Sequence, residues 1–298
     1  HTAYRRQRQM CIRDRLSKEE KEVVERLIFA FVNCEKLQRH MQLLLKKGSM
    51  YKIYNRNLLY HGCIPLNEDG TFKEIQVYDK VYKGKELYDV LETYVRKAFV
   101  AVDEREKEKG KDILWFIWSS PSSPLFGKDK MATFERYFLA EEETHKENKN
   151  AYYKFLEDEA VADRILQEFH VTGECTHIVN GHVPVHHGAG ESPIKCGGKL
   201  LIIDGGFSRA YQKETGIAGY TLIYNSWGMI LAAHEPFTSA ADAISKESDI
   251  LSDSILVKRT VKRKTVGETD IGMKLKERIA ELEELLAAYR DGLLIEKS

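Results

Sequence analysis

The stretch HIVNGHVPVHHGAGESPIKCGGKLLIIDGGFS, residues 177–208, decides how this sequence is interpreted. A short apolar run ends at Gly181-His182, a glycine-rich loop follows, and a second apolar run ends at Asp204. Short apolar runs that are bounded by glycine and polar residues predict buried strands. The sequence therefore places an imidazole, with glycine directly before it, at the point where a strand ends.

The same design occurs earlier in the chain, in NLLYHGCIP (57–65). Both His61 and His182 stand beside glycine and shortly before proline. Glycine lets a backbone turn sharply beside a ligand, and an imidazole held there can offer one nitrogen to a metal ion. The alternative for each is a core histidine that is satisfied by hydrogen bonds. Two histidines indicate a metal site but are too few ligands to complete one.

Composition excludes several classes of protein. The 298 residues are 43% hydrophobic and 31% charged, with 46 basic and 46 acidic residues, so no broad field attracts nucleic acid or anionic membrane. No apolar run approaches the roughly 20 residues that span a bilayer. Five widely spaced cysteines without a CxxC pair favour reduced thiols. We expect a cytoplasmic protein that has no nucleic-acid or membrane partner.

The first fifteen residues, HTAYRRQRQMCIRDR, have little periodicity and are predicted to be a non-native segment. The remainder, 16–298, is predicted to be one mixed α+β domain. Periodicity predicts helices from Ser17 and over 34–47, 85–109, 129–170 and 270–293. It predicts strands over 51–54, 58–60, 112–118, 176–181, 199–204, 219–225, 228–234 and 255–265, with a small hairpin excursion before residue 85.

Longer runs of the sequence resemble a known family. These runs are LLYHGCIPLNEDGTFKEI, SPLFGK, TFERYF, HIVNGHVPV, GESPIK, GGKLLIIDGGFSRAYQKETGIAGYTLIYNSWG and TVGETDIGMKLKERIAELEELLAAY. They are similar to class III fructose-1,6-bisphosphatase, the type most familiar from Firmicutes, and cover nearly everything from residue 16 onward. The resemblance implies the calcineurin-like metallophosphoesterase fold, a β-sandwich flanked by helices with two metal ions where strands end.

The resemblance also implies roles for individual residues. The HG and GH motifs of that superfamily supply metal ligands, which correspond to His61 and His182. Asp204 would orient a metal-ligating histidine or, alternatively, cap a turn. The motifs D-x-H, G-D-x-x-D-R-G and G-N-H-[DE] are absent from the sequence. The chain therefore resembles the C-terminal part of the fold. We assign no catalytic residue in it and expect it to be inactive by itself, with apolar faces left uncovered.

The activity implied for the full-length enzyme is metal-dependent hydrolysis of fructose 1,6-bisphosphate to fructose 6-phosphate and phosphate, a step of gluconeogenesis. Two ions, with Mn²⁺ expected and other divalent ions left open, would share the attacking hydroxide. Phosphate oxygens need fixed cationic donors. Lys128, with Ser122 or Ser123 nearby, is the candidate for the transferred phosphate, and Lys195 for the second phosphate. A solvated loop lysine is the alternative for Lys128.

Two other functions compete with this one. A related metallophosphoesterase that acts on phosphoprotein or dinucleoside polyphosphate would share His61 and His182, but the extended match to IPLNEDG and GGFSRAYQKETGIAGYT favours the sugar phosphatase. The third alternative is a non-catalytic binding module that is derived from the same fold. The sequence leaves homo-oligomer formation open.

Overall fold

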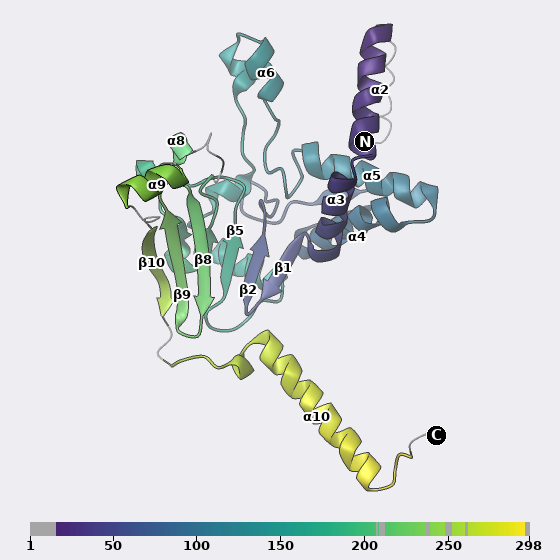
Figure 1. Cartoon of the computed structure of the whole chain (residues 1–298), viewed down its shortest axis with the longest axis vertical. Coiled ribbons are helices and arrows are strands. Elements are labelled where there is room, and N and C mark those ends of the chain that lie inside the picture. The colour runs from purple at the N-terminus through teal and green to yellow at the C-terminus, as the bar shows by residue number, and fades with distance from the viewer. Residues whose placement is uncertain are drawn as a thin grey trace. The chain divides into compact units, whose positions relative to one another are not determined.

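The computed structural model describes residues 16–206, 208, 212–236, 239–247, 252–259 and 262–295 (Figure 1). The predicted non-native segment 1–15 lies outside them. The chain forms two compact units: unit 1 holds the chain up to Lys52 together with Tyr60–Phe155, and unit 2 holds Ile53–Leu59 and the chain from Leu156. None of the described helices is long and apolar enough to span a bilayer.

Unit 1 is mainly helical. Its helices are α2 (Lys18–Val32), α3 (Glu35–Lys47), α4 (Gly84–Val100), α5 (Glu104–Ser119) and α6 (Thr133–Phe138), with the 3₁₀ turns η1 (Glu142–His145) and η2 (Ala151–Lys154). Strands β3 (Ile75–Val77) and β4 (Lys80–Tyr82) form an antiparallel hairpin. Ser17 and Glu20 form the predicted capping box at the start of α2. No residue of α2 or α3 is buried.

The predicted strand over 112–118 is wrong, because these residues form the second half of α5. Ile113 and Ile117, four positions apart, are buried, while Trp115 and Trp118 are 47% and 59% exposed. The apolar run is therefore the amphipathic end of a helix whose charged first half has high helix propensity. The predicted single helix 85–109 is also interrupted: Asp103 accepts a hydrogen bond from the Arg105 N–H and starts α5 anew.

The predicted helix over 129–170 is likewise wrong for most of its length. It consists of α6, η1, η2 and, in unit 2, α7 (Glu159–Glu168). Side-chain hydrogen bonds to the backbone explain the difference, since they compete with helix formation. Asp129 accepts from the Asn148 N–H at 2.8 Å, and Asn150 accepts from the N–H groups of Tyr152 and Leu66.

Unit 2 contains two sheets. The larger has the order β1-β2-β5-β7-β6 and the smaller the order β10-β9-β8. Strands β2, β5 and β7 pair in parallel, while β6 is antiparallel to β7. The strands are β1 (Tyr51–Tyr54), β2 (Asn57–Tyr60), β5 (His177–Asn180), β6 (Ile194–Lys195), β7 (Leu200–Ile202), β8 (Gly219–Asn225), β9 (Gly228–His234) and β10 (Ser252–Arg259). The remaining elements are η3 (His187–Ala189), η4 (Cys196–Gly198), α8 (Gln212–Thr215), α9 (Ala240–Lys246), η5 (Val266–Glu268) and α10 (Asp270–Arg290).

One hydrophobic cluster joins the two sheets. Val179 of β5, Leu201 of β7 and Met229 of β9 are buried together, and Leu222 and Val257 pack against them. Because side chains alternate along a strand, the neighbours Ile178 and Leu200 point to the other face of the larger sheet. Helix α7 contacts β5 there, with Val161, Ala162, Ile165 and Leu166 buried. The sheets thus pack face to face, with a helix outside the larger one.

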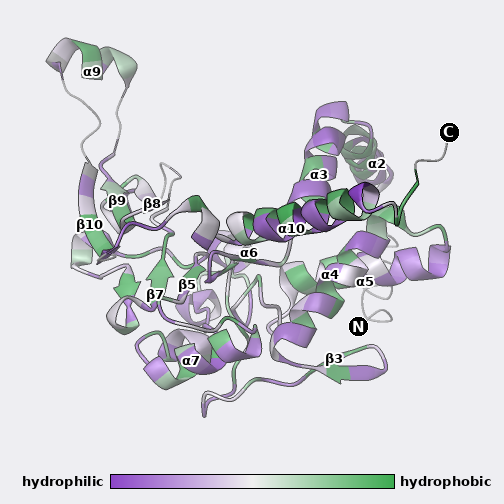
Figure 2. Cartoon of the chain, turned by 90° about the horizontal axis from the view of Figure 1, so that it is seen from below, coloured by the Kyte–Doolittle hydropathy of each residue, from purple (hydrophilic) through white to green (hydrophobic). Residues whose placement is uncertain are grey.

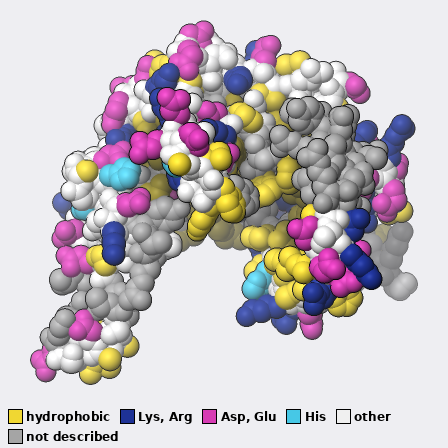
Figure 3. Space-filling model, turned by 90° about the horizontal axis from the view of Figure 1, so that it is seen from above, with side chains coloured by type: hydrophobic (Ala, Val, Ile, Leu, Met, Phe, Trp, Pro, Cys, Tyr) yellow, Lys and Arg dark blue, Asp and Glu magenta, His cyan; other side chains and the backbone are white. Residues whose placement is uncertain are grey.

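The structure confirms the predicted α+β class and most predicted strands. The hairpin of β8 and β9 has the predicted bounds, and the Trp227 N–H donates to the Asn225 side chain in its turn. The closing helix is α10. The predicted strand over 255–265 begins earlier, as β10, and residues 260–261 lie outside the described residues. Apolar side chains also lie exposed on the surface (Figure 3).

Helices α4 and α5 approach each other most closely at Gly110. A Cβ atom at this position would lie 2.4 Å from the Ala98 backbone nitrogen and 2.6 Å from the Tyr94 carbonyl oxygen. Both are backbone atoms, so the helices would have to separate to admit even a methyl group. Glycine is therefore required here by the helix–helix contact and not by its own backbone angles.

We predict that Gly110→Ala destabilises unit 1 by roughly 1–3 kcal/mol, the usual effect of overpacking a core. Alanine's advantage in helix propensity, about 1 kcal/mol, is too small to reverse the sign. Urea denaturation followed by circular dichroism measures the change. Lys111→Ala on the same helix, which removes only an exposed ion pair with Glu108, is the control and should change stability by less than about 0.5 kcal/mol. Equal or higher stability of Gly110→Ala would contradict this packing.

Candidate functional site

His182 lies two residues beyond the last residue of the buried strand β5. Its backbone is in the left-handed region, with φ of +69°, and the Val183 N–H donates to the Gly181 carbonyl at 2.9 Å. A non-glycine residue pays about 1 kcal/mol or more for this conformation, so the surrounding loop must hold it in place. The sharp turn that Gly181 predicts is therefore present at the predicted strand end.

Asp204 stands at the end of the neighbouring strand β7. Asn180 pairs with Ile202, so His182 and Asp204 follow the carboxyl ends of two parallel strands at equal distances along the chain. The Val185 N–H donates to the Asp204 carbonyl at 2.9 Å, and Asp204 Oδ1 accepts from the Gly206 N–H at 2.9 Å. The carboxylate thus makes the turn-capping contact, while the backbone of Asp204 anchors the loop that carries His182.

Asn180 is a residue of this strand end that the sequence analysis did not select. It is only 2% exposed and closes the otherwise apolar run of β5. A polar residue at the end of an apolar run, directly before glycine, was the available signal. Its carbonyl accepts from the Ile203 N–H, which ties β5 to β7 where the loops begin.

Lys195, the candidate for the second phosphate, lies on β6 with its side chain 13% exposed. Its ammonium group is 3.3 Å from Glu157 and 3.5 Å from Glu191. Two carboxylates therefore already face this cation. A phosphate group could reach it only by taking the place of these partners.

In unit 1, His61 is exposed between two buried neighbours, Tyr60 and Gly62, and Tyr60 belongs to a buried tyrosine cluster. Tyr60 and Tyr152 join their hydroxyl groups at 2.8 Å, and the Tyr88 hydroxyl donates to the Cys63 carbonyl at 3.0 Å. Burial raises the pKa of both Tyr60 and Tyr88 well above the usual value, so these hydroxyls stay protonated. The imidazole is thus carried on a rigid base.

The loop 119–128 packs directly against the backbone after His61. A Cβ atom on Gly62 would lie 2.3 Å from the Pro124 carbonyl oxygen, and the Cys63 N–H donates to that same oxygen at 2.9 Å. Ser123, a candidate phosphate ligand, is 1% exposed; its hydroxyl donates to the Ile117 carbonyl and accepts from the N–H groups of Leu125 and Phe126. The Ser123 side chain is therefore committed to holding this loop.

Lys128 is half-buried and ion-paired. Its ammonium group lies 2.7 Å from a Glu147 carboxylate oxygen, and the other oxygen accepts from the Ala132 N–H at 3.0 Å. Burial pushes the pKa of Glu147 upward, but the hydrogen bonds from Lys128 and Ala132 outweigh it and leave the pKa below its usual value. The carboxylate thus stays ionised beside Lys128. The two residues are 19 positions apart in the chain, so the sequence pattern gave no signal of this pair.

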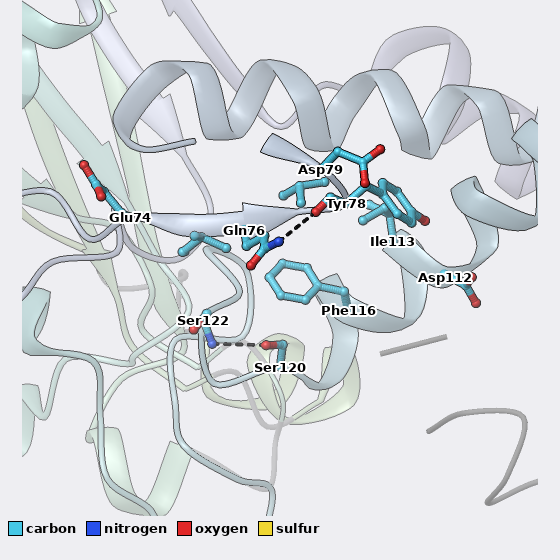
Figure 4. A pocket seen from close by; sticks show the side chains of 11 residues that line it. Glu74, Gln76, Tyr78, Asp79, Asp112, Ile113, Phe116, Ser120 and Ser122 are labelled. Atoms are coloured by element: carbon cyan, nitrogen blue, oxygen red, sulfur yellow. Dashed lines mark hydrogen bonds between the residues drawn. The ribbon is translucent and has the colours of Figure 1, made fainter. Parts of the chain in front are cut away.

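Ser122 lines a cavity of about 580 Å³ between the β3 hairpin and α5 (Figure 4). Apolar walls from Ile113 and Phe116 alternate with the carboxylates of Asp79 and Asp112. None of the described residues that line it is Lys or Arg, and its carboxylates repel anions. The cavity thus lacks the fixed cation that the predicted phosphate contact of Ser122 requires.

The donors present do not complete a metal centre. Among the described ranges there is no group of three or more His, Cys, Asp or Glu side chains that could hold a metal ion. His61 and His182, both at strand ends, remain the two predicted ligands. The described residues therefore do not fit a two-metal site by themselves.

A buried histidine lies at the opposite end of β5. His177 is 5% exposed, and its Nδ1 is 3.0 Å from the Asn57 side-chain oxygen on β2. Burial, reinforced by the charges of Lys258 and Lys264, lowers its pKa to about 4. The imidazole is neutral at pH 7 and is a structural link between two strands. The sequence analysis missed it because His177 opens an apolar run without a glycine beside it.

Comparison with known proteins identifies the class. The family model of Firmicute fructose-1,6-bisphosphatase matches residues 12–291. Proteins named fructose-1,6-bisphosphatase class 3 are 53% identical over 284 residues in Clostridium novyi, 52% over 285 in Listeria innocua and 54% over 283 in Clostridioides difficile. Each alignment covers 95% of this chain and 43–44% of the relative, so the chain spans less than half of their length.

The chain therefore belongs to the Firmicute, or class III, fructose-1,6-bisphosphatase family. This confirms the resemblance drawn from the sequence motifs. No solved structure matches the chain. The α+β architecture is thus established by the structure, while the relation to calcineurin-like enzymes stays a prediction.

We predict that His177 makes stability depend on pH. Its pKa is lower in the folded than in the unfolded chain, so the unfolded state binds the extra proton between about pH 6.5 and pH 4. The stabilising contribution is complete above pH 6.5 and declines as the pH falls, by about 3 kcal/mol in total. Urea denaturation from pH 7.5 to 4.5 measures it. His177→Asn should flatten this dependence, and an unchanged slope in the variant would contradict the assignment.

Proposed function

We propose that this chain acts as part of a longer class III enzyme that hydrolyses fructose 1,6-bisphosphate to fructose 6-phosphate and phosphate. The observation that carries the proposal is the family match over residues 12–291, together with more than 50% identity to relatives of that name. The class of reaction is hydrolysis of a phosphoric monoester in gluconeogenesis. A cytoplasmic location belongs to the same proposal.

His61 and His182 are the proposed metal ligands of this chain. The support is local: each follows the carboxyl end of a strand of the larger sheet, and glycine beside each permits a close approach of the backbone. Within the longer enzyme, divalent ions with Mn²⁺ preferred would supply Lewis-acid chemistry. The further ligands would come from the rest of that enzyme. What this chain contributes is one imidazole in each unit, each placed within two residues of the end of a strand.

Lys128 and Lys195 are the proposed phosphate contacts. Each already lies beside a carboxylate, which phosphate would have to replace. Lys128 is bonded to Glu147, and Lys195 lies beside Glu157 and Glu191. Substrate phosphate would replace a carboxylate at each ammonium group. Such an exchange would leave the displaced carboxylate without its cation, so that carboxylate would oppose phosphate binding at either lysine.

We predict that His61→Ala and His182→Ala, made in the full-length enzyme, lower metal content and fructose-bisphosphatase activity together. Loss of one ligand weakens a metal site far more than it weakens a large core. Metal is measured by mass spectrometry of the dialysed protein, activity by phosphate release, and folding by circular dichroism. His186→Ala, which alters an exposed histidine on the same loop as His182, is the matched control and should retain both.

The same preparation tests the substrate. Fructose 1,6-bisphosphate should be hydrolysed faster than phosphoprotein or dinucleoside polyphosphate, the substrates of the competing phosphoesterase function. Preference for either of the latter would refute the proposed substrate but not the metal ligands. Full metal content and turnover in both histidine variants would refute the ligands.

We predict that the 298-residue chain by itself releases negligible phosphate from fructose 1,6-bisphosphate, even with added Mn²⁺. The described residues offer two histidines and no cluster of ligands that could generate the attacking hydroxide. A phosphate-release assay on the purified chain measures this. Turnover near that of the full-length enzyme would show that the catalytic ligands lie within this chain.

A further inference from the structure

Helix α10 leaves nearly its whole apolar surface in solvent. It has 21 residues, of which only Gly272 is buried. Apolar and polar residues alternate along it (Figure 2). An isolated helix of this length is marginal in water, because most helical stability in proteins comes from packing an amphipathic face. This face therefore needs a partner.

The apolar residues of α10 follow a coiled-coil pattern. Leu275, Ile279, Leu282, Leu286 and Tyr289 succeed one another at intervals of four, three, four and three residues. Each is between 48% and 55% exposed. Alternating intervals of three and four keep a seam on one side of a helix and are the a and d positions of a heptad repeat. These five residues are called the α10 seam below.

Two charged residues lie beside the seam, and neither has a charged residue at an ion-pairing position in α10 itself. Lys276 and Glu283 each follow a d position directly, so both are e positions. No charged residue stands three or four positions from either of them in the sequence. Arg278 on the other flank differs, since it forms an ion pair with Glu281 at 2.6 Å. Lys276 and Glu283 are thus arranged for contacts between helices.

We propose that α10 pairs with α10 of a second copy of this chain as an antiparallel two-stranded coiled coil. In antiparallel pairs an a residue meets a d residue and e positions face each other. Ile279 then packs on Leu282 of the partner subunit, and Leu275 on Leu286 of the partner subunit. Lys276 faces Glu283 of the partner subunit, and the symmetry repeats each contact. The register overlaps the two helices over their full length.

Size and charge favour this orientation over the parallel one. In the antiparallel register Tyr289, the largest seam residue, falls opposite Gly272 of the partner subunit, the smallest residue of the same stripe. A parallel pair would instead place Tyr289 against Tyr289 of the partner subunit. It would also direct Glu283 to Arg278 of the partner subunit, the residue that already pairs with Glu281.

Charge reversal tests the pairing. Sedimentation equilibrium of the 298-residue chain should show a dimer, and Ile279→Asp should be monomeric with unchanged circular dichroism of the remainder. Lys276→Glu or Glu283→Lys should each weaken dimerisation about tenfold, and the double variant should restore it. Lys274→Glu and Glu277→Lys, on the outer face of the helix, are controls of equal charge change and should have no effect. A monomeric chain, or a double variant no tighter than the singles, overturns the proposal.

Cross-linking tests the orientation independently. Leu275→Cys and Leu286→Cys chains are prepared separately, both with the exposed Cys34 changed to Ser, and are then mixed under mild oxidation. The antiparallel register joins Cys at position 275 to Cys at position 286 of the other chain, which mass spectrometry of the linked peptides identifies. Linkage of the Leu275→Cys chain to itself, without that mixed product, would show a parallel pair and overturn the proposal.

Discussion

The parallel pairing of β5 between β2 and β7 is the constraint on which unit 2 depends. All four residues of β5 are buried, and both edges of the strand are hydrogen-bonded. One face packs on the second sheet and the other on α7. A strand that is enclosed in this way has one possible register, because a shift by a single residue would exchange its two faces. The ends of β5 are therefore held in place, and so is the start of the loop that follows Asn180.

This constraint explains which parts of the fold the sequence could predict. Some apolar runs are short and have glycine or polar residues at their ends, such as β5, β8 and β9. These runs fit only the periodicity of a strand, and their boundaries are clear. The prediction for the run DILWFIW failed because its six apolar residues fit either a buried strand or one end of a helix, and periodicity cannot separate them. Packing of Gly110 against α4 favours the helical form of α5. A contact of this kind cannot be recognised in the local sequence pattern.

The candidate site divides in a similar way. Glycine after His61 marks a backbone requirement that the sequence shows directly, because a side chain at Gly62 would collide with the Pro124 carbonyl. The partners of Lys128 and Lys195 are side chains from other elements, Glu147 and Glu157, and sequence spacing carries no record of them. Ser122 and Ser123 are adjacent and chemically identical, yet one lines a cavity and the other is sealed inside a turn. Motifs predicted the candidate residues of the site, and tertiary structure decided what each side chain touches.

The position of Met229 has a consequence for the chemical durability of the protein. Its thioether lies between the two sheets of unit 2 and is 2% exposed, whereas Met273 on α10 is 46% exposed. Oxidation to the sulfoxide would turn a flexible apolar side chain into a polar one, which a core between sheets cannot hydrate. Oxidants reach Met229 only when the sheets separate, so its sulfoxide would record opening of this core, while Met273 would be oxidised in the intact fold. Oxidative ageing of the protein should thus proceed in two stages, first at exposed methionines such as Met273 and then at Met229 in the core.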